Sequence, residues 1–192
     1  MRDAQVLSSN VLVDAPKRFV HEVPLMPDGD QIDWYYYVDT TPSVMVVPVT
    51  ADGNVILVKQ YRHNLKRDTL ELPAGIVGRG EDITAAALRE LEEETGHVPA
   101  PGASLVSLGA YYSLPSETNK YCNLFLASPV VRIADPYVDT EIEKYFDMGI
   151  VVMKFADAVR AIGEDLNGLE TVAALLMAER LLTSNERSPR GH

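Results

Sequence analysis

Three glutamates, Glu90, Glu93 and Glu94, lie within about one helical turn of each other. They belong to a run of good helix formers from about Asp82 to Thr95, in which residues three and four apart share a face. Like charges at this spacing destabilise a helix by roughly 0.2–0.5 kcal/mol per pair. Mg²⁺ and Mn²⁺ take oxygen ligands, so such a cluster could hold a divalent cation. The alternative is a solvated acidic face, which is the usual reason for a run of charges.

The residues around these glutamates have a spacing that is hard to obtain by chance. The pattern is G-x5-E-x7-R-E-L-x-E-E-x-G, and its seven glycine and charged positions are Gly75, Glu81, Arg89, Glu90, Glu93, Glu94 and Gly96. Because each residue type is used at roughly 5–7%, seven fixed positions coincide on the order of once in 10⁹ starting points. This spacing indicates a site with a chemical role.

The ends of the predicted helix carry their own signals. Asp82 is suited to cap the N-terminus, and Gly96 stands where a helix C-terminus favours a left-handed residue. Arg89 lies one turn before Glu93 and can pair with it. The residues that we expect to pack on a core are Thr84, Ala87, Leu88, Leu91 and Thr95.

The pattern resembles the box of the Nudix hydrolases, and it is complete except at its last position, where His97 replaces the usual aliphatic residue. That departure concerns packing after the helix rather than metal chemistry. The resemblance implies an α/β fold, an α/β/α sandwich around a mixed sheet. It also implies hydrolysis of a nucleoside diphosphate linked to another group, with Mg²⁺ or Mn²⁺ as the cofactor.

The same resemblance assigns roles within the box. Arg89 would orient a box glutamate, and Glu81 would brace the loop. Glu93 would act as a ligand or as acid/base support. The metal ligands that the resemblance implies are Glu90, Glu93, Glu94 and the carbonyl of Ala74.

Composition limits the remaining possibilities. The 192 residues suit one domain with a small appendage, and no apolar run approaches the roughly 18–20 residues of a membrane span. The N-terminus lacks the apolar stretch of a signal peptide, and the single cysteine, Cys122, fits a reducing cytoplasm. A net charge of −11 argues against binding to nucleic acid or an anionic membrane. Bound cations must reverse the local field before a diphosphate can dock.

Residues 1–42 are expected to form a β-rich segment, followed by a Nudix-type domain over 43–183 and a disordered tail over 184–192. Strands are predicted over Arg18–Pro24 and Gln31–Asp39. The aromatic residues of the second strand, Trp34 among them, would either pack in a hairpin or stack on a nucleobase. In family members that act on ADP-ribose, such a segment often crosses to a partner subunit, so we expect a homodimer.

A hairpin of the central sheet is predicted from strands over Ser43–Val49 and Val55–Tyr61. Arg62 follows directly and could bind a phosphate bidentately, although a single arginine is by default a surface residue. The sequence QYR followed by ELPAG is similar to the ADP-ribose and nucleotide-sugar branch of the family, which supports Arg62 as a substrate contact.

Strands over Ser104–Tyr112 and Tyr121–Ala127 are separated by a polar loop that contains Pro115 and Glu117. ADP-ribose hydrolases typically carry a proline near here, so both residues are candidate substrate contacts. The alternative is a plain hairpin loop. A long surface loop is then expected over Ser128–Ile142, and loops of this length are often functional.

The C-terminal part is expected to contain a strand over Lys144–Lys154 and helices over Phe155–Ile162 and Leu169–Leu182. Hydrolysis of a pyrophosphate needs a carboxylate that accepts a proton from water. In the nucleotide-sugar branch this base usually comes from the acidic loop, so Glu141 is our choice, with Asp139 and Glu143 behind it. Glu93 within the box is the alternative base.

Three functions remain open from the sequence. The favoured one is a metal-dependent pyrophosphatase acting on ADP-ribose or a related nucleoside diphosphate sugar. The second is a Nudix hydrolase of nucleoside triphosphates or dinucleoside polyphosphates, against which the QYR strand end and the long N-terminal segment speak. The third is a non-catalytic nucleotide-sugar sensor, which degenerate box glutamates would favour; the box glutamates are intact here.

Overall fold

The computed structural model describes residues 5–15, 17–137 and 148–187. Contacts divide the chain into two compact units. The smaller unit comprises Met1–Pro42 with Tyr112–Tyr121, and the larger comprises Ser43–Tyr111 with Cys122–His192. None of the helices in the described part of the chain is long and apolar enough to cross a membrane.

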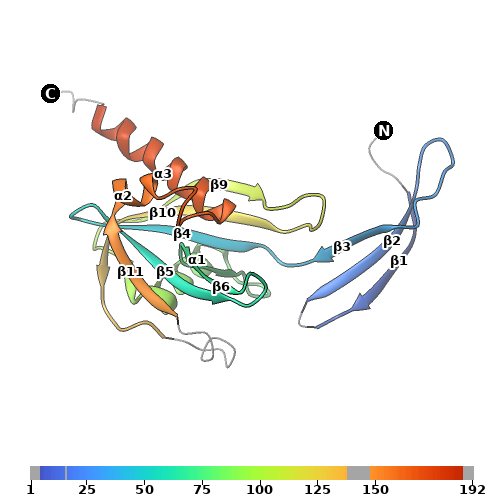
Figure 1. The fold of residues 1–192 in the computed structure, drawn as a ribbon, viewed down its shortest axis with the longest axis horizontal. Coiled ribbons are helices and arrows are strands. Elements are labelled where there is room, and N and C mark those ends of the chain that lie inside the picture. The colour runs from blue at the N-terminus through green and yellow to red at the C-terminus, as the bar shows by residue number, and fades with distance from the viewer. Residues whose placement is uncertain (1–4, 16, 138–147, 188–192) are drawn as a thin grey trace. The chain divides into compact units, whose positions relative to one another are not determined.

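Within the described residues, the larger unit is built on an eight-stranded mixed sheet (Figure 1). The strands are β4 (Ser43–Thr50), β5 (Asn54–Arg62), β6 (Arg67–Glu71), β7 (Ala74–Ile76), β8 (His97–Pro99), β9 (Leu105–Tyr112), β10 (Tyr121–Arg132) and β11 (Gly149–Lys154). The main order is β11-β5-β4-β10-β8, with β6 beside β5, β7 beside β4 and β9 beside β10. Strands β4 and β10 are parallel, whereas β4–β5, β5–β6, β5–β11, β4–β7 and β8–β10 are antiparallel.

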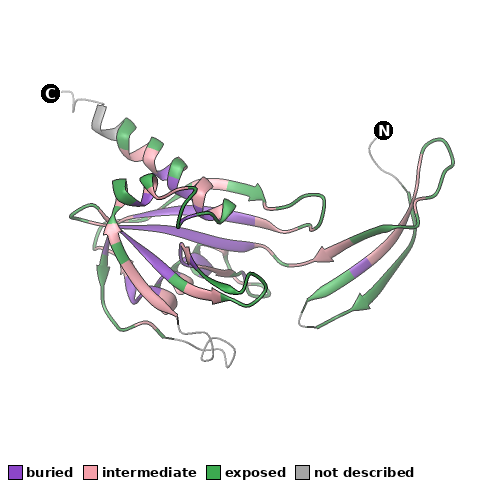
Figure 2. Ribbon diagram, viewed as in Figure 1, coloured by how far each residue is buried: buried purple, intermediate pink, exposed green. Residues whose placement is uncertain are grey.

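Helices cover both faces of this sheet. Alternation along β4 sends Val44 and Val46 into a core with helix α1 (Ile83–Thr95). It sends Met45 and Val47 into a second core with helices α2 (Phe155–Arg160) and α3 (Leu169–Arg187). Figure 2 shows the buried central strands between these layers. Burying one large aliphatic side chain is worth about 1.5–3 kcal/mol, so the two cores hold the layers together. The predicted α/β/α sandwich is confirmed.

The smaller unit is an antiparallel sheet in the order β1-β2-β3, made of β1 (Gln5–Val13), β2 (Arg18–Leu25) and β3 (Tyr35–Asp39). Val20 is its one buried residue among those described between positions 5 and 42. The loop between β9 and β10 belongs to this unit because it bonds to the end of β3. The Val38 N–H donates to the Glu117 carbonyl over 2.9 Å, and Thr118 Oγ1 donates to the Val38 carbonyl over 2.8 Å.

The strand predictions need several corrections. β1 was not predicted, and the strand expected from Gln31 begins at Tyr35. The loop expected from Ser128 begins only at Ile133, because β10 continues to Arg132. Its last residues pair with β8, a short strand that the sequence analysis did not predict.

The C-terminal elements also differ from expectation. β11 begins at Gly149, and residues 144–147 of the predicted strand lie outside the described residues. Helix α3 runs past Leu182 to Arg187, so the tail that we expected to be disordered begins as helix. The hydroxyls of Thr183 and Ser184 donate to carbonyls one turn earlier, which is compatible with a continued helix. Residues 188–192 lie outside the described residues.

Candidate active site

Helix α1 has the two ends that the sequence predicted. Asp82 has extended backbone angles, and its Oδ1 accepts hydrogen bonds from the N–H groups of Thr84 (2.9 Å) and Ala85 (3.0 Å). A side-chain cap of this kind is worth about 1 kcal/mol. Gly96 ends the helix in the left-handed conformation at φ 68°, and its N–H donates to the Glu92 carbonyl. The caps fix both the start and the stop of the segment that carries the glutamates.

The buried side of α1 differs in part from the prediction. Ala87, Leu91 and Thr95 are buried as expected, but Thr84 and Leu88 are exposed. Both lie on the flank of the buried stripe, which passes instead through Ala86, Ala87 and Leu91. Glu90 and Glu94 occupy the same side of the helix as this stripe. The Glu90 side chain is only 12% exposed, so its carboxylate needs partners within the protein.

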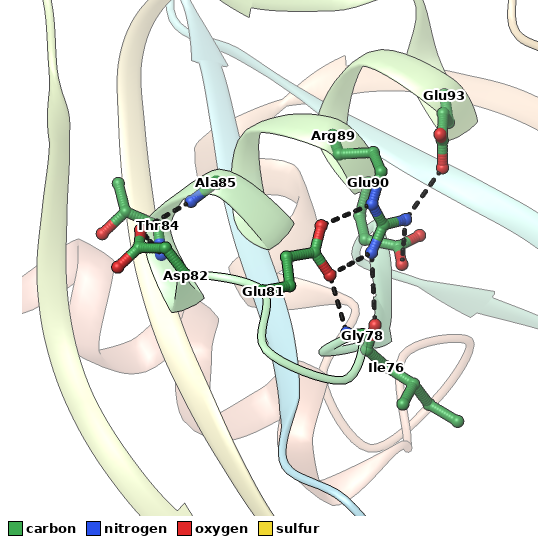
Figure 3. Close-up of polar contacts among 9 residues, drawn as sticks. All are labelled: Ile76, Gly78, Glu81, Asp82, Thr84, Ala85, Arg89, Glu90 and Glu93. Atoms are coloured by element: carbon green, nitrogen blue, oxygen red, sulfur yellow. Dashed lines mark hydrogen bonds and ion pairs between the residues drawn. The ribbon is translucent and has the colours of Figure 1, made fainter.

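Arg89 binds this carboxylate together with those of Glu81 and Glu93 (Figure 3). Nε and Nη2 donate to the two oxygens of Glu81 over 2.8 and 3.0 Å. Nη1 donates to Glu90 Oε1 over 2.7 Å and to Glu93 Oε2 over 3.0 Å, and Nη2 also donates to the Ile76 carbonyl over 3.2 Å. All five N–H donors of the guanidinium are thereby used. Arg89 therefore positions the box carboxylates and has no donor left for a substrate phosphate.

Glu81 ties the preceding loop to this arginine. Its Oε2 accepts the Gly78 N–H over 2.6 Å, while both of its oxygens bind Arg89. The Arg89 hydrogen bonds, followed by the Gly78 bond, lower the pKa of Glu81 to about 2. In return, the hydrogen bonds from Glu81 raise the pKa of Arg89 against the effect of burial, and Glu90 and Glu93 add to the rise. Glu81 thus holds the loop against α1.

The carboxylates of Glu90 and Glu94 rest on the backbone of Ala74 and Gly75 in β7. A Cβ at Gly75 would lie 1.9 Å from Glu90 Oε1, so only glycine leaves room for this carboxylate. The Ala74 N–H donates to Glu94 Oε2 over 2.9 Å. The structure therefore brings Ala74, Glu90 and Glu94 together, and Arg89 links Glu93 to the same group.

This arrangement suits a hard divalent cation by its donor chemistry. Among the described residues, no three Asp, Glu, His or Cys side chains form a ready-made metal cluster. Arg89 holds Glu90 and Glu93, and the Ala74 N–H holds Glu94. The donors at hand are carboxylate and carbonyl oxygens, which Mg²⁺ and Mn²⁺ prefer. The room that Gly75 leaves for Glu90 is the structural feature that favours this fit.

Arg62, the predicted phosphate contact and the last residue of β5, forms an ion pair with Glu71, the last residue of β6. Arg62 was predicted as a phosphate contact, whereas no role was predicted for Glu71 or for Thr69, whose hydroxyl bonds to Glu71. The sequence alone shows that Glu71 is charged and that it begins the segment ELPAG. Its partner could be found only with the register of β6, a strand that was not predicted.

The segment that follows β10 wraps the C-terminal end of α1. The Ile133 and Ala134 N–H groups donate to the Gly96 carbonyl over 2.8 and 3.3 Å, and the Tyr137 N–H donates to the Glu93 carbonyl over 2.7 Å. A Cβ at Gly96 would lie 2.1 Å from the Ala134 carbonyl oxygen, so glycine is needed here for space as well as for its φ. A cavity of about 340 Å³ between the helix and this segment is lined by Arg89, Glu92, Glu93, Ala134, Asp135 and Tyr137.

The remaining predicted site residues are either distant from α1 in sequence or not among the described residues. Asp139, Glu141 and Glu143 are outside the described residues. Trp34 belongs to the smaller unit, where its side chain is 69% exposed just before β3. Pro115 and Glu117 lie in the β9–β10 loop of that unit.

His97, the unusual residue at the end of the box, has a packing role. It is buried at the start of β8, opposite Arg132 of β10. Its Nδ1 lies 2.7 Å from the Thr95 carbonyl oxygen. Because that oxygen can only accept, Nδ1 carries the proton. This agrees with the expectation that His97 concerns packing after the helix.

The chain is similar to known proteins in sequence and in fold. Residues 39–166 match the NUDIX domain. An ADP-ribose pyrophosphatase of Bacillus subtilis (strain 168) is 41% identical over 85 residues, 44% of this chain and 44% of the relative. An ADP-ribose pyrophosphatase of Saccharomyces cerevisiae is 38% identical over 121 residues, 57% of this chain and 50% of the relative. One of Mycobacterium tuberculosis is 30% identical over 151 residues, 77% of this chain and 69% of the relative.

The chain thus spans about half the length of the Bacillus and Saccharomyces relatives that it matches. A solved structure of an ADP compounds hydrolase superposes with a TM-score of 0.80 and 21% identity, covering 98% of both chains. This likeness concerns the fold. Because the domain match extends over well more than half of the residues, the chain belongs to the NUDIX domain family.

Proposed function

We propose that this protein hydrolyses the pyrophosphate bond of ADP-ribose or a related nucleoside diphosphate sugar, giving a nucleoside monophosphate and a sugar phosphate. The observation that carries the proposal is the set of carboxylates that Arg89 and the Ala74–Gly75 backbone hold together on α1. The names of three relatives, each an ADP-ribose pyrophosphatase, support the substrate class.

Glu90, Glu93, Glu94 and the Ala74 carbonyl would hold Mg²⁺ or Mn²⁺. When bound, such a cation supplies charge screening for the diphosphate and makes the attacking water more acidic. The protein's own residues do the positioning: Arg89 orients Glu90 and Glu93, and Glu81 orients Arg89. Arg62 would bind the diphosphate.

The proton acceptor would come from the acidic loop rather than from the box. Glu93 already accepts a hydrogen bond from Arg89 over 3.0 Å and is itself one of the proposed metal ligands, so its carboxylate is occupied by other partners. We therefore assign the base to Glu141, with Asp139 and Glu143 as the next candidates. Glu141→Gln should depress kcat strongly while KM stays within a few-fold, the pattern of a lost transition-state interaction. Near-normal kcat in Glu141→Gln, Asp139→Asn and Glu143→Gln would place the base inside the box.

The smaller unit would contribute to substrate binding and to assembly. Trp34 offers an exposed ring for stacking on a base, and the β9–β10 loop offers Pro115 and Glu117. The apolar residues exposed on β1 support a homodimer. The sequence contains a single cysteine, Cys122, which fits the reducing cytoplasm that we propose as the location.

Hydrolysis over a substrate panel tests the proposed function. The panel contains ADP-ribose, ADP- and GDP-sugars, NADH and deoxynucleoside triphosphates, each with Mg²⁺, with Mn²⁺ and with chelator. We expect the highest kcat/KM with ADP-ribose or an ADP-sugar and no turnover with chelator. Preferred hydrolysis of triphosphates would contradict the substrate class, and metal binding without any turnover would indicate a sensor.

A further inference from the structure

The ion pair between Arg62 and Glu71 has a side-on geometry. Nε of Arg62 donates to Glu71 Oε1 over 2.8 Å, and Nη2 donates to Oε2 over 2.5 Å. Such bidentate pairs are among the strongest and most directional contacts in proteins. The other terminal nitrogen, Nη1, makes no hydrogen bond within the part of the chain that the structure describes. The pair therefore fixes the plane of the guanidinium and leaves donors available to an anion.

The Thr69 hydroxyl binds the Glu71 carboxylate and so limits its movement. Its Oγ1 lies 2.6 Å from Glu71 Oε1 and 3.1 Å from the Gln60 carbonyl oxygen. Thr69 is only 7% exposed, so its hydroxyl has a fixed environment. The single hydroxyl proton is best directed at the carboxylate, which is the nearer and charged acceptor. Thr69 Oγ1 and Arg62 Nε thus both bind Glu71 Oε1, while Arg62 Nη2 binds Oε2.

Strand register places these residues on the face of the sheet that α1 covers. In the β5–β6 pairing, Gln60 lies opposite Thr69 and Val58 lies opposite Glu71. Side chains two residues apart share a face, so Arg62 lies on the same face of β5 as Ile56. Ile56 belongs to the core that also contains Ala86, Ala87 and Leu91 of α1.

The electrostatics agree with this placement. The hydrogen bonds to Glu71 raise the pKa of Arg62 against the effect of burial, and the charges of Glu71 and Glu94 add to the rise. Glu94 of the box is therefore close enough to interact with Arg62. Arg89, the other arginine of the site, has all five donors occupied and cannot bind a phosphate without breaking one of these hydrogen bonds.

We propose that Glu71, held by Thr69, is a positioning residue that orients Arg62 so that the unused edge of its guanidinium binds the diphosphate of the substrate. The proposal rests on the proposed function of the same site. The chain has a net charge of −11, so a cation of fixed orientation near Glu94 would help to attract an anionic substrate to the site. Fixing the guanidinium beforehand also removes the entropy cost of ordering it on binding.

Glu71→Gln tests this geometry with little change in shape. The amide oxygen can still accept from one donor of Arg62, but the amide N–H₂ then faces a second donor, so the bidentate pair is lost. The matched control is Asp68→Asn. Asp68 pairs with Lys59 over 2.9 Å on the opposite face of the same hairpin. Thr69→Val replaces the hydroxyl with a methyl group of similar size. It should weaken turnover and ADP binding in the same direction as Glu71→Gln, but to a smaller extent.

Two measurements are made on the full chain: steady-state turnover of ADP-ribose with Mg²⁺, and calorimetric titration with ADP in the presence of Mg²⁺. We expect Glu71→Gln to lower kcat/KM by about 10–100-fold and to raise the Kd for ADP about tenfold, since small misplacements of a contact are costly. Asp68→Asn should match the wild type in both. In an Arg62→Ala background, Glu71→Gln should change either value by less than about twofold, because its partner is gone.

Two results would overturn the proposal. In the first, Glu71→Gln matches Asp68→Asn in turnover and in ADP binding. In the second, Glu71→Gln has the same effect with and without the Arg62 side chain, which is the pattern of a general loss of hairpin structure. If the wild type does not hydrolyse ADP-ribose, the proposed function fails, and the ADP titrations alone decide the role of Glu71.

Discussion

At the scale of single residues, Arg89 determines how the acidic cluster can exist. Three carboxylates within one helical turn repel each other, and two of them are bound here by a guanidinium that also holds Glu81. The third, Glu94, is satisfied by the Ala74 N–H. The cluster is therefore stable as a folded feature before any ligand arrives.

Replacing Glu94 with Gln should separate metal binding from folding. The amide oxygen can still accept the Ala74 N–H, so the fold should be kept, but the charge that a divalent cation needs is lost. Turnover should fall at least about 100-fold, since even the partners behind metal ligands are worth roughly 10–100-fold. Turnover and Mg²⁺ titration calorimetry measure the two effects. Glu92→Gln, an exposed neighbour on the same helix, serves as the control. Unchanged Mg²⁺ affinity and turnover in Glu94→Gln would refute the assignment.

Glu81 should give folding stability a specific pH dependence. Its pKa falls from 4.5 to about 2 on folding, chiefly through Arg89. A depressed carboxyl pKa contributes stability that is full above the unfolded value and is lost as the pH falls from 4.5 towards 2. Glu81→Gln removes this pH-dependent contribution to folding stability. Urea midpoints measured in chelator between pH 6 and 3 should therefore fall less steeply in the variant than in the wild type. Parallel curves for the two proteins would show that Glu81 contributes nothing to the acid response.

The residues of the box could be predicted from sequence because their geometry is local. A helix fixes the relation between Arg89, Glu90 and Glu93 without help from the rest of the chain. The Arg62–Glu71 pair could not be predicted in this way. It depends on how β5 and β6 align across a hairpin, and register is set by the fold rather than by either strand alone.

At the scale of elements, the site is a contact between the end of β7 and one side of α1. Both are held to β4, which pairs with β7 and packs against α1. The loop between them is tied back by Glu81 and Arg89. The glycine at the start of the box makes this contact possible, because any larger residue would occupy the space of a carboxylate.

Gly75→Ala should test the contact directly. Gly75 does not have a positive φ, so alanine brings a steric clash with Glu90 and no backbone strain. We expect Mg²⁺ affinity and kcat to fall about 10–100-fold, as for the loss of a group that orients a ligand. Gly149→Ala is the matched control, since its Cβ would lie 4.0 Å from the Lys59 Cβ, an ordinary contact. Calorimetry and turnover for both variants provide the measurement, and equal behaviour of the two would exclude the steric role of Gly75.

Element length decided which parts of the fold could be predicted. β4 is almost wholly buried, β5 is buried over Val55–Val58, and both strands are rich in β-branched residues, so their pattern was clear. β7 and β8 have three residues each and exist through their pairing with β4 and β10. The extension of β10 to Arg132 depends on β8 in the same way. Short strands that need a distant partner leave little periodic signal in their own sequence.

At the scale of the whole molecule, the smaller unit leaves many apolar side chains exposed to solvent. All described residues of β1 are exposed, and the exposed apolar side chains include Val6, Leu7, Val11, Leu12 and Val13. Soluble monomers rarely expose apolar patches of this kind without a partner surface. A second copy of the chain is the partner that the family resemblance predicts.

Leu12→Arg should therefore disrupt assembly. We expect the wild type to scatter light at micromolar concentration as a particle of two chains, each of 21.1 kDa. A charge in place of Leu12, which is 53% exposed, should shift the particle to a single chain, because an unpaired charge is costly in an apolar interface. Leu169→Arg, at a residue 72% exposed on α3, introduces the same charge in the larger unit and should leave the dimer intact. A chain that begins at Thr41 should also be monomeric. A wild-type protein that scatters as one chain would exclude the dimer, and an unaffected dimer in Leu12→Arg would place its interface away from β1.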